Sequence, residues 1–185
     1  EPLAQAILAD HGVDPAALAV GYISEAVPDV KSALEGARDI VAEGLAEDAA
    51  LLGRLRSHMK QVARLSAKVV AGKEAEGAKF SDYFAHSEPW HAAPSHRVLA
   101  MLRGQNEGFL AVDLEIDPDA PKGDSPAERA CAAAIGGTGK GAGDVWLREA
   151  AAWTWRVKLR TSLTLDLMAE LRERAEAEAI NVFAR

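Results

Sequence analysis

The strongest sequence signals lie in the stretch Lys79–Leu114, which reads KFSDYFAHSEPWHAAPSHRVLAMLRGQNEGFLAVDL. It opens with aromatic, His and Pro residues, continues into the apolar string HRVLAMLRG, and ends in alternating apolar and polar residues after Gly108. Leu110, Val112, Leu114 and Ile116 share one face of an extended chain, so the alternation predicts a strand over Leu110–Ile116.

A lone strand would leave its backbone polar groups unpaired, so a partner is needed. The segment Leu65–Ala71 is the best candidate, because Leu65, Ala67 and Val69 alternate with Ser66, Lys68 and Val70 before Gly72. The sequence therefore predicts an antiparallel pair of Leu65–Ala71 against Leu110–Ile116.

The remainder of the chain has helical periodicity. Asp14, Asp29 and Asp48 each stand where an N-cap is expected, and Ser125 with Glu128 forms a capping box around Pro126. The resulting prediction is a mainly α, multi-helix domain with a small two-stranded β element. It covers residues 1–185 as one region, with a candidate sub-boundary at the loop 117–124.

The aromatic part of the opening stretch is predicted to be architectural. It should connect the segment before Pro94 to the helix after it through largely buried side chains. The residues expected in this core are Tyr83, Phe84, Trp90, Val98, Leu99 and Leu102.

Composition limits the class of protein. The 185 residues are 49% hydrophobic, 26% charged and 5% aromatic, which is enough to bury a core. The sequence contains neither an apolar run of about 20 residues nor a signal-peptide pattern, and its single cysteine, Cys131, favours a reducing cytoplasmic location. Helical patterning that continues to Arg185 and the absence of an initiating Met predict that the chain is an excerpt of a longer polypeptide.

The formal net charge of −7 argues against nucleic-acid binding through bulk electrostatics. Local basic groups nevertheless stand out: one around Arg56, one around Lys158, and a pair that flanks the HRVLAMLRG string. Such rows seat phosphates, and exposed Trp residues stack bases. The alternative is that the basic residues pair with the plentiful carboxylates and that the Trp residues belong to the core. The candidate nucleic-acid contacts are Arg54, Arg56, Lys60, Arg64, Arg97, Arg103, Arg156, Lys158 and Arg160.

Several apparent motifs fail on inspection. The string GGTGKGAG at Gly136–Gly143 lacks the Ser or Thr that follows the Lys of a phosphate loop, and it is interpreted as a flexible linker. His86, His91 and His96 lie five residues apart with Pro89 and Pro94 between them, which does not fit a zinc helix. The sequence predicts no catalytic residue, no metal site and no cofactor, and hence no enzyme.

Five strings together resemble the Tex family of bacterial transcription accessory proteins, in order and spacing along nearly the whole chain. They are EPLA, ALEGARDIVAEGLAEDAAL, KFSDYFAHSEP, SHRVLAMLRGQNEG and AEAEAINVFAR, of which SHRVLAMLRGQNEG and AINVFAR are the most specific. The resemblance implies a helical region that precedes a YqgF domain in a large cytoplasmic multidomain protein. Nucleic-acid binding in this family depends chiefly on a C-terminal OB-fold domain that this chain lacks.

The resemblance thus implies a scaffold segment of a protein involved in RNA binding and transcription regulation. Its implied partners are nucleic acid, mainly through other domains, and the rest of the same polypeptide including the YqgF-like domain. The alternative is a protein–protein docking module for transcription or translation machinery. No membrane partner is expected.

Overall fold

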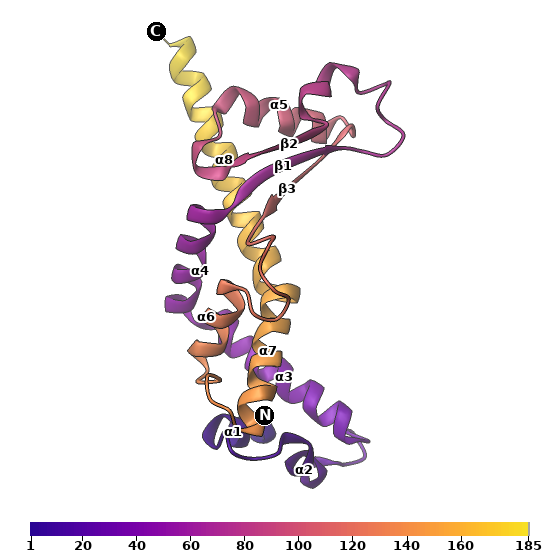
Figure 1. Ribbon diagram of the computed structural model, residues 1–185, viewed down its shortest axis with the longest axis vertical. Helices are drawn as coiled ribbons and strands as arrows, with labels where there is room; N and C mark the ends of the chain where they lie inside the picture. The colour runs from indigo at the N-terminus through magenta and orange to yellow at the C-terminus, as the bar shows by residue number, and fades with distance from the viewer. Residues whose placement is uncertain (185) are drawn as a thin grey trace. The chain divides into compact units, whose positions relative to one another are not determined.

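The computed structural model describes residues 1–184 and divides the chain into two compact units (Figure 1). Unit 1 comprises Glu1–Leu55 with Asp119–Ser162, and unit 2 comprises Arg56–Pro118 with the residues from Leu163 onward. The chain passes from one unit to the other at three points. One of them, Pro118–Asp119, falls within the predicted loop 117–124. The other two fall inside continuous helices, where no sequence signal marks a boundary.

Unit 1 is helical. It contains α1 (Pro2–Ala9), α2 (Pro15–Ala19), α3 (Val30–Glu47), the first half of α4 (Ala49–Val62), α6 (Pro126–Ala134) and α7 (Ala142–Thr154). A π-helical turn, η4 (Trp155–Leu159), joins α7 to α8 (Arg160–Phe183). The α1 and α3 helices both contact α7, and their buried faces form a core that includes Leu3, Ile7, Val41, Leu45, Leu147 and Ala151.

The predicted helix starts are confirmed by their capping bonds. The Asp14, Asp29 and Asp48 carboxylates accept backbone N–H groups of α2, α3 and α4, with N–O distances of 2.7 to 2.9 Å for the shortest bond at each cap. Ser125 and Glu128 form the predicted capping box at the start of α6. These caps satisfy N–H groups that have no partner within a helix.

Unit 2 is built on an antiparallel sheet with strand order β2-β1-β3. The strands are β1 (Arg64–Val69), β2 (Ala85–Pro89) and β3 (Leu110–Glu115), and Leu65 of β1 lies opposite Leu114 of β3. The predicted antiparallel pair is confirmed. The two-stranded prediction is wrong in number, because β2 pairs with the other edge of β1.

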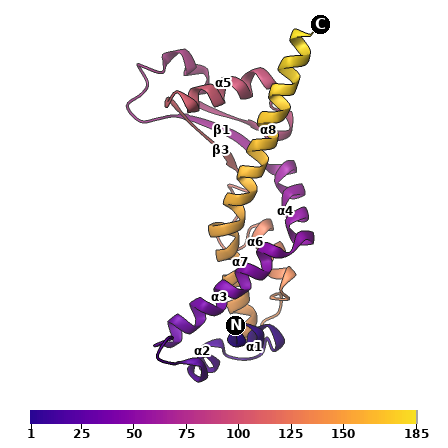
Figure 2. The ribbon, with the colours of Figure 1, turned by 180° about the vertical axis from the view of Figure 1, so that it is seen from behind.

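The α5 helix (Ser95–Asn106) lies alongside this sheet and contacts β3 (Figures 1 and 2). Gly104 permits the contact, since a Cβ atom there would lie 2.5 Å from Cδ1 of Leu110. Trp90 follows β2 and donates its indole N–H to the Leu167 carbonyl of α8 at 3.3 Å. On α8, the side chains at every fourth position, Leu163, Leu167, Leu171 and Ala175, are buried.

The core around Trp90 consists in part of other residues than the six that were predicted. Trp90 and Val98 are buried as expected, whereas Tyr83, Phe84, Leu99 and Leu102 are half-buried. The inward face of α5 consists of Val98, Met101 and Gly104, so Leu99 and Leu102 stand one position off that face. Phe80 supplies the buried ring that was expected at Phe84.

No helix among residues 1–184 is both long enough and apolar enough to cross a bilayer.

Candidate nucleic-acid interface

The basic residues around Arg56 bind groups of their own unit, and Arg64 lies on β1 and not on α4. Arg56 forms an ion pair with Asp166 at 3.1 Å, and Lys60 forms one with Glu170 at 2.7 Å. Arg64 donates from Nε and Nη2 to Ser87, with both distances 2.9 Å. Because the two ion pairs are largely exposed, each is worth about 1 kcal/mol or less.

Arg97 is used differently, because its partner is buried. Its Nε and Nη2 atoms donate to the two oxygens of Glu88 at 2.9 and 3.2 Å, and His86 contacts the same carboxylate. Burial by itself would raise the pKa of Glu88, but the hydrogen bonds from Arg97 and His86 hold this pKa below its ordinary value. Arg97 therefore holds a buried charge in place and is poorly suited to bind a phosphate.

Arg103, near the end of α5, is exposed. It forms an ion pair with Glu107, one helical turn later, at 2.9 Å. Lys79 contacts the same carboxylate at 2.6 Å. These two donors lower the pKa of Glu107.

The second basic group lies on and just after η4. Arg156 pairs at 3.3 Å with Glu128, whose side chain is 4% exposed. Lys158 and Arg160 are exposed and form no ion pair with any residue in the described part of the chain; the same holds for Arg54. Of the nine predicted contacts, these three form neither an ion pair nor a side-chain hydrogen bond within residues 1–184, and Arg64 is bonded only to the neutral Ser87.

The Trp residues next to this group separate into two kinds. Trp155 is 5% exposed and belongs to the core. Trp153 is half-buried, and the Arg38 guanidinium lies 3.8 Å from its ring centroid.

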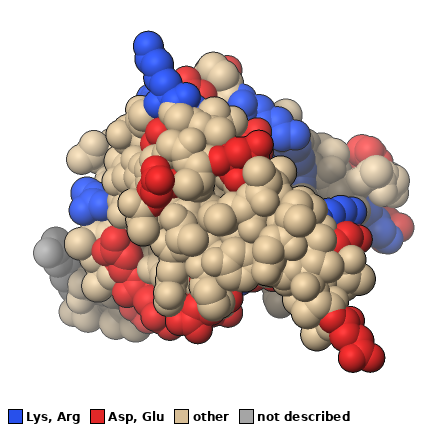
Figure 3. All heavy atoms as spheres, turned by 90° about the horizontal axis from the view of Figure 1, so that it is seen from below, with Lys and Arg blue, Asp and Glu red and all other residues tan. Residues whose placement is uncertain are grey.

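Figure 3 shows the charges on one face as small separate groups of basic and acidic side chains around a broad uncharged area.

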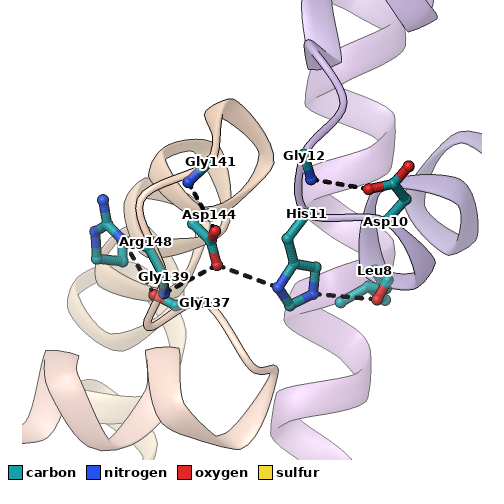
Figure 4. A network of polar contacts seen from close by, with 9 residues as sticks. All are labelled: Leu8, Asp10, His11, Gly12, Gly137, Gly139, Gly141, Asp144 and Arg148. Atoms are coloured by element: carbon teal, nitrogen blue, oxygen red, sulfur yellow. Dashed lines mark hydrogen bonds and ion pairs between the residues drawn. The ribbon is translucent and has the colours of Figure 1, made fainter.

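The glycine-rich loop before α7 is organised around a carboxylate (Figure 4). Asp144 accepts the backbone N–H groups of Gly139 and Gly141 at 3.1 and 2.9 Å, and it contacts Nδ1 of His11 at 3.1 Å. The Gly143 N–H donates to the His11 carbonyl at 3.0 Å. The flexible-linker interpretation of GGTGKGAG is therefore wrong, because the loop fastens the segment after α1 to the start of α7.

The Asp144 carboxylate titrates below its ordinary range. Burial would raise its pKa, but the N–H groups of Gly141 and Gly139 and the His11 ring stabilise the ionised form, and the pKa falls below 3.8. A lowered pKa in the folded state adds stability that is fully present above 3.8 and is lost as the pH falls through the folded value.

We expect Asp144→Asn to lower the melting temperature at neutral pH and to reduce its dependence on pH below 3.8. Thermal denaturation followed by circular dichroism from neutral to acidic pH measures both effects. Asp119→Asn is the matched control, since Asp119 is exposed and makes no ion pair within residues 1–184. Parallel pH profiles for wild type and Asp144→Asn would contradict this assignment.

Sequence reasoning missed His11, Asp144, Arg38 and Glu88. A weak signal existed for one of them, because an acidic residue three positions after a helix start is a typical capping arrangement, and Asp144 has that position relative to Gly141. The partners of His11 and Arg38 are distant in sequence, and the partners of Glu88, His86 and Arg97, lie within nine residues but follow no capping or helical spacing.

The chain belongs to the Tex central region-like family, whose model matches residues 10–183.

Its similar relatives include the transcriptional accessory protein Tex of Neisseria gonorrhoeae, 46% identical over 191 residues, and the protein tex of Bordetella pertussis, 47% identical over 193 residues. The protein YhgF of Escherichia coli is 47% identical over 190 residues. Each alignment covers 100% of this chain and 24 or 25% of the relative, so the chain spans about a quarter of their length.

Proposed function

We propose that this chain is a helical scaffold segment of a Tex-like transcription accessory protein, which acts in the cytoplasm in RNA binding and transcription regulation. Family membership and the names of the relatives support the proposal. In this role the segment is not an enzyme. The main nucleic-acid contacts come from other parts of the polypeptide, which include a YqgF-like domain.

The observation that carries the scaffold role is the use of the basic side chains. Six of the nine candidates, Arg56, Lys60, Arg64, Arg97, Arg103 and Arg156, bind groups of their own unit. Two of these six hold buried carboxylates and stabilise the fold. With a chain charge of −7, phosphate is attracted only where basic groups remain free.

We expect the isolated chain to bind single-stranded RNA with a dissociation constant of about 1 μM or weaker at physiological salt. Fluorescence anisotropy with a labelled oligouridylate at about 50 and 200 mM salt measures the affinity and its salt slope. Replacing Lys158 and Arg160 by Gln removes two free charges and should lower the slope by roughly 0.7 per lost contact. Arg103→Gln is the control and should leave the slope unchanged. A nanomolar dissociation constant at physiological salt would show that the chain is a primary binding domain.

A docking module for transcription or translation machinery is the second candidate function. One observation favours it: an apolar groove of about 610 Å³ between α5 and α8 is lined by Pro94, Leu99, Val182 and Phe183, and Phe183 is 90% exposed. Purified RNA polymerase and ribosomes are the probes. Binding that is lost in Phe183→Ser and kept in Leu165→Ser, another exposed apolar position on α8, would favour docking.

A further inference from the structure

A cleft of about 720 Å³ lies between α3 and α7 inside unit 1. Trp146 and Trp153 form one wall, and Arg38 and Lys31 of α3 line the opposite side. Its volume is in the range of small-ligand sites. We propose that this cleft binds one base and the adjoining phosphate of a single-stranded nucleic acid. The inference rests on the proposed function and assigns a site to the weak binding of single-stranded RNA that is expected of this chain.

The aromatic wall suits a flat ring. Trp146 and Trp153 are seven residues apart on α7, so they lie on the same face two turns apart, and both are half-buried. Arg38 stacks on Trp153 at 3.8 Å from the ring centroid. Bases stack on indole rings and on guanidinium planes, and such stacking accepts any base.

The Arg38 guanidinium keeps donors for a ligand. Its Nε is buried without an acceptor among the described residues, and its charge contact to Asp39 is 3.6 Å long. The side chain as a whole is 28% exposed, so a phosphate or base oxygen in the cleft accepts a charge-assisted bond from the guanidinium. Other arginines differ here: Arg97 and Arg156, for example, hydrogen-bond to carboxylates.

The charges around the cleft favour a nucleotide over a simple anion. Three basic residues, Lys31, Arg38 and Arg156, and two acidic residues, Glu35 and Glu149, line it. The carboxylates accept hydrogen bonds from base N–H groups, such as the N3–H of uracil, whereas they repel a ligand that consists only of negative charge. An acidic peptide has the charge but not the aromatic surface, so it fits this lining less well.

The π-helical turn is an independent feature at the same place. Turns of this kind are rare and occur frequently at functional sites. It carries Arg156, which lines the cleft, and the exposed Lys158, which has no ion pair in the part of the chain that the structure describes. Arg160, which is also exposed, begins α8 directly after this turn.

The test measures binding of a fluorescein-labelled oligouridylate of about 12 nucleotides to the whole 185-residue chain at low salt. We expect Arg38→Gln and Trp146→Leu each to weaken binding at least about fivefold. Glu149→Gln removes a negative charge that repels the phosphate but keeps an acceptor oxygen for the base, so it should tighten binding. Arg129→Gln is the matched control, because Arg129 is exposed, pairs with Asp124 and does not line the cleft. Circular dichroism verifies that each variant is folded, and Glu149→Gln tests the site even if Trp146→Leu does not fold.

Three outcomes would overturn the site. The first is unchanged affinity in Arg38→Gln and Glu149→Gln while wild type binds, which leaves the scaffold proposal standing. The second is equal competition by an oligoglutamate of matched charge, which would show an anion site without base stacking. The third is no detectable binding by wild type at low salt, which removes the direct contact but not the scaffold role. Nanomolar affinity together with sensitivity to these variants would confirm the cleft and reject the scaffold proposal.

Discussion

Trp90→Ala is expected to give the largest loss of stability in unit 2. Trp90 is 3% exposed, and its side chain joins the end of β2 to α8 through the bond to the Leu167 carbonyl. Truncating a buried aromatic residue costs about 3–5 kcal/mol, since the cavity fills only partly. The melting temperature should fall by roughly 6 to 20 °C, measured by calorimetry.

Two variants separate the contribution of the buried ring of Trp90 to stability from that of its N–H bond. Trp90→Phe keeps most of the ring volume but loses the N–H donor, so its cost should be smaller, about 1–3 kcal/mol. Phe84→Ala, at a half-buried position, should also cost less than Trp90→Ala. An unchanged melting temperature in Trp90→Ala would show that the contact between η3 (Trp90–Ala92) and α8 does not stabilise the fold.

Gly141→Ala is expected to disrupt unit 1. A Cβ atom at this position would overlap the carbonyl oxygen of His11, which also accepts the Gly143 N–H. Both sides of this contact are backbone, so the strain is relieved only by moving the loop away from His11. We expect a cost of about 3 kcal/mol or more and a clear fall in melting temperature.

Gly44→Ala is the matched control for this substitution. Gly44 lies in the interior of α3 with open space where the added methyl group would lie, so the same chemical change should stabilise by about 0.4–1 kcal/mol. If Gly141→Ala lowers the free energy of unfolding and Gly44→Ala raises it, the loop glycine is needed for the close approach to the His11 carbonyl. A stabilising or neutral Gly141→Ala would contradict the His11 contact.

The parts of the fold that depend on local chemistry were predictable from the sequence. Caps at Asp14, Asp29 and Asp48 act within three residues, and the alternation at Leu110–Ile116 reports burial on one face. The β2 strand, AHSEP, was missed because it has no β-branched residue and no apolar alternation. It is extended because its backbone pairs with the free edge of β1.

The candidate site was less predictable, because it depends on which charges meet. Arg97 and Lys158 are both basic residues in a basic neighbourhood, yet one is held by a buried carboxylate and the other is free. Arg38 was not a candidate, since nothing in ALEGARDIV indicates that its side chain lies on Trp153, more than one hundred residues later in the chain. Tertiary structure decides which basic residues remain free for a ligand.

The bond between His11 and Asp144 has a consequence for synthesis on the ribosome. The two residues are 133 positions apart, and at about 5–20 residues per second the second emerges roughly 7 to 27 s after the first. Until then α1 and α3 have no α7 to pack against, and the apolar side chains of Leu3, Ile7 and Leu45 lack part of their cover. Part of the apolar surface of α1 and α3 therefore stays uncovered until α7 has been synthesised.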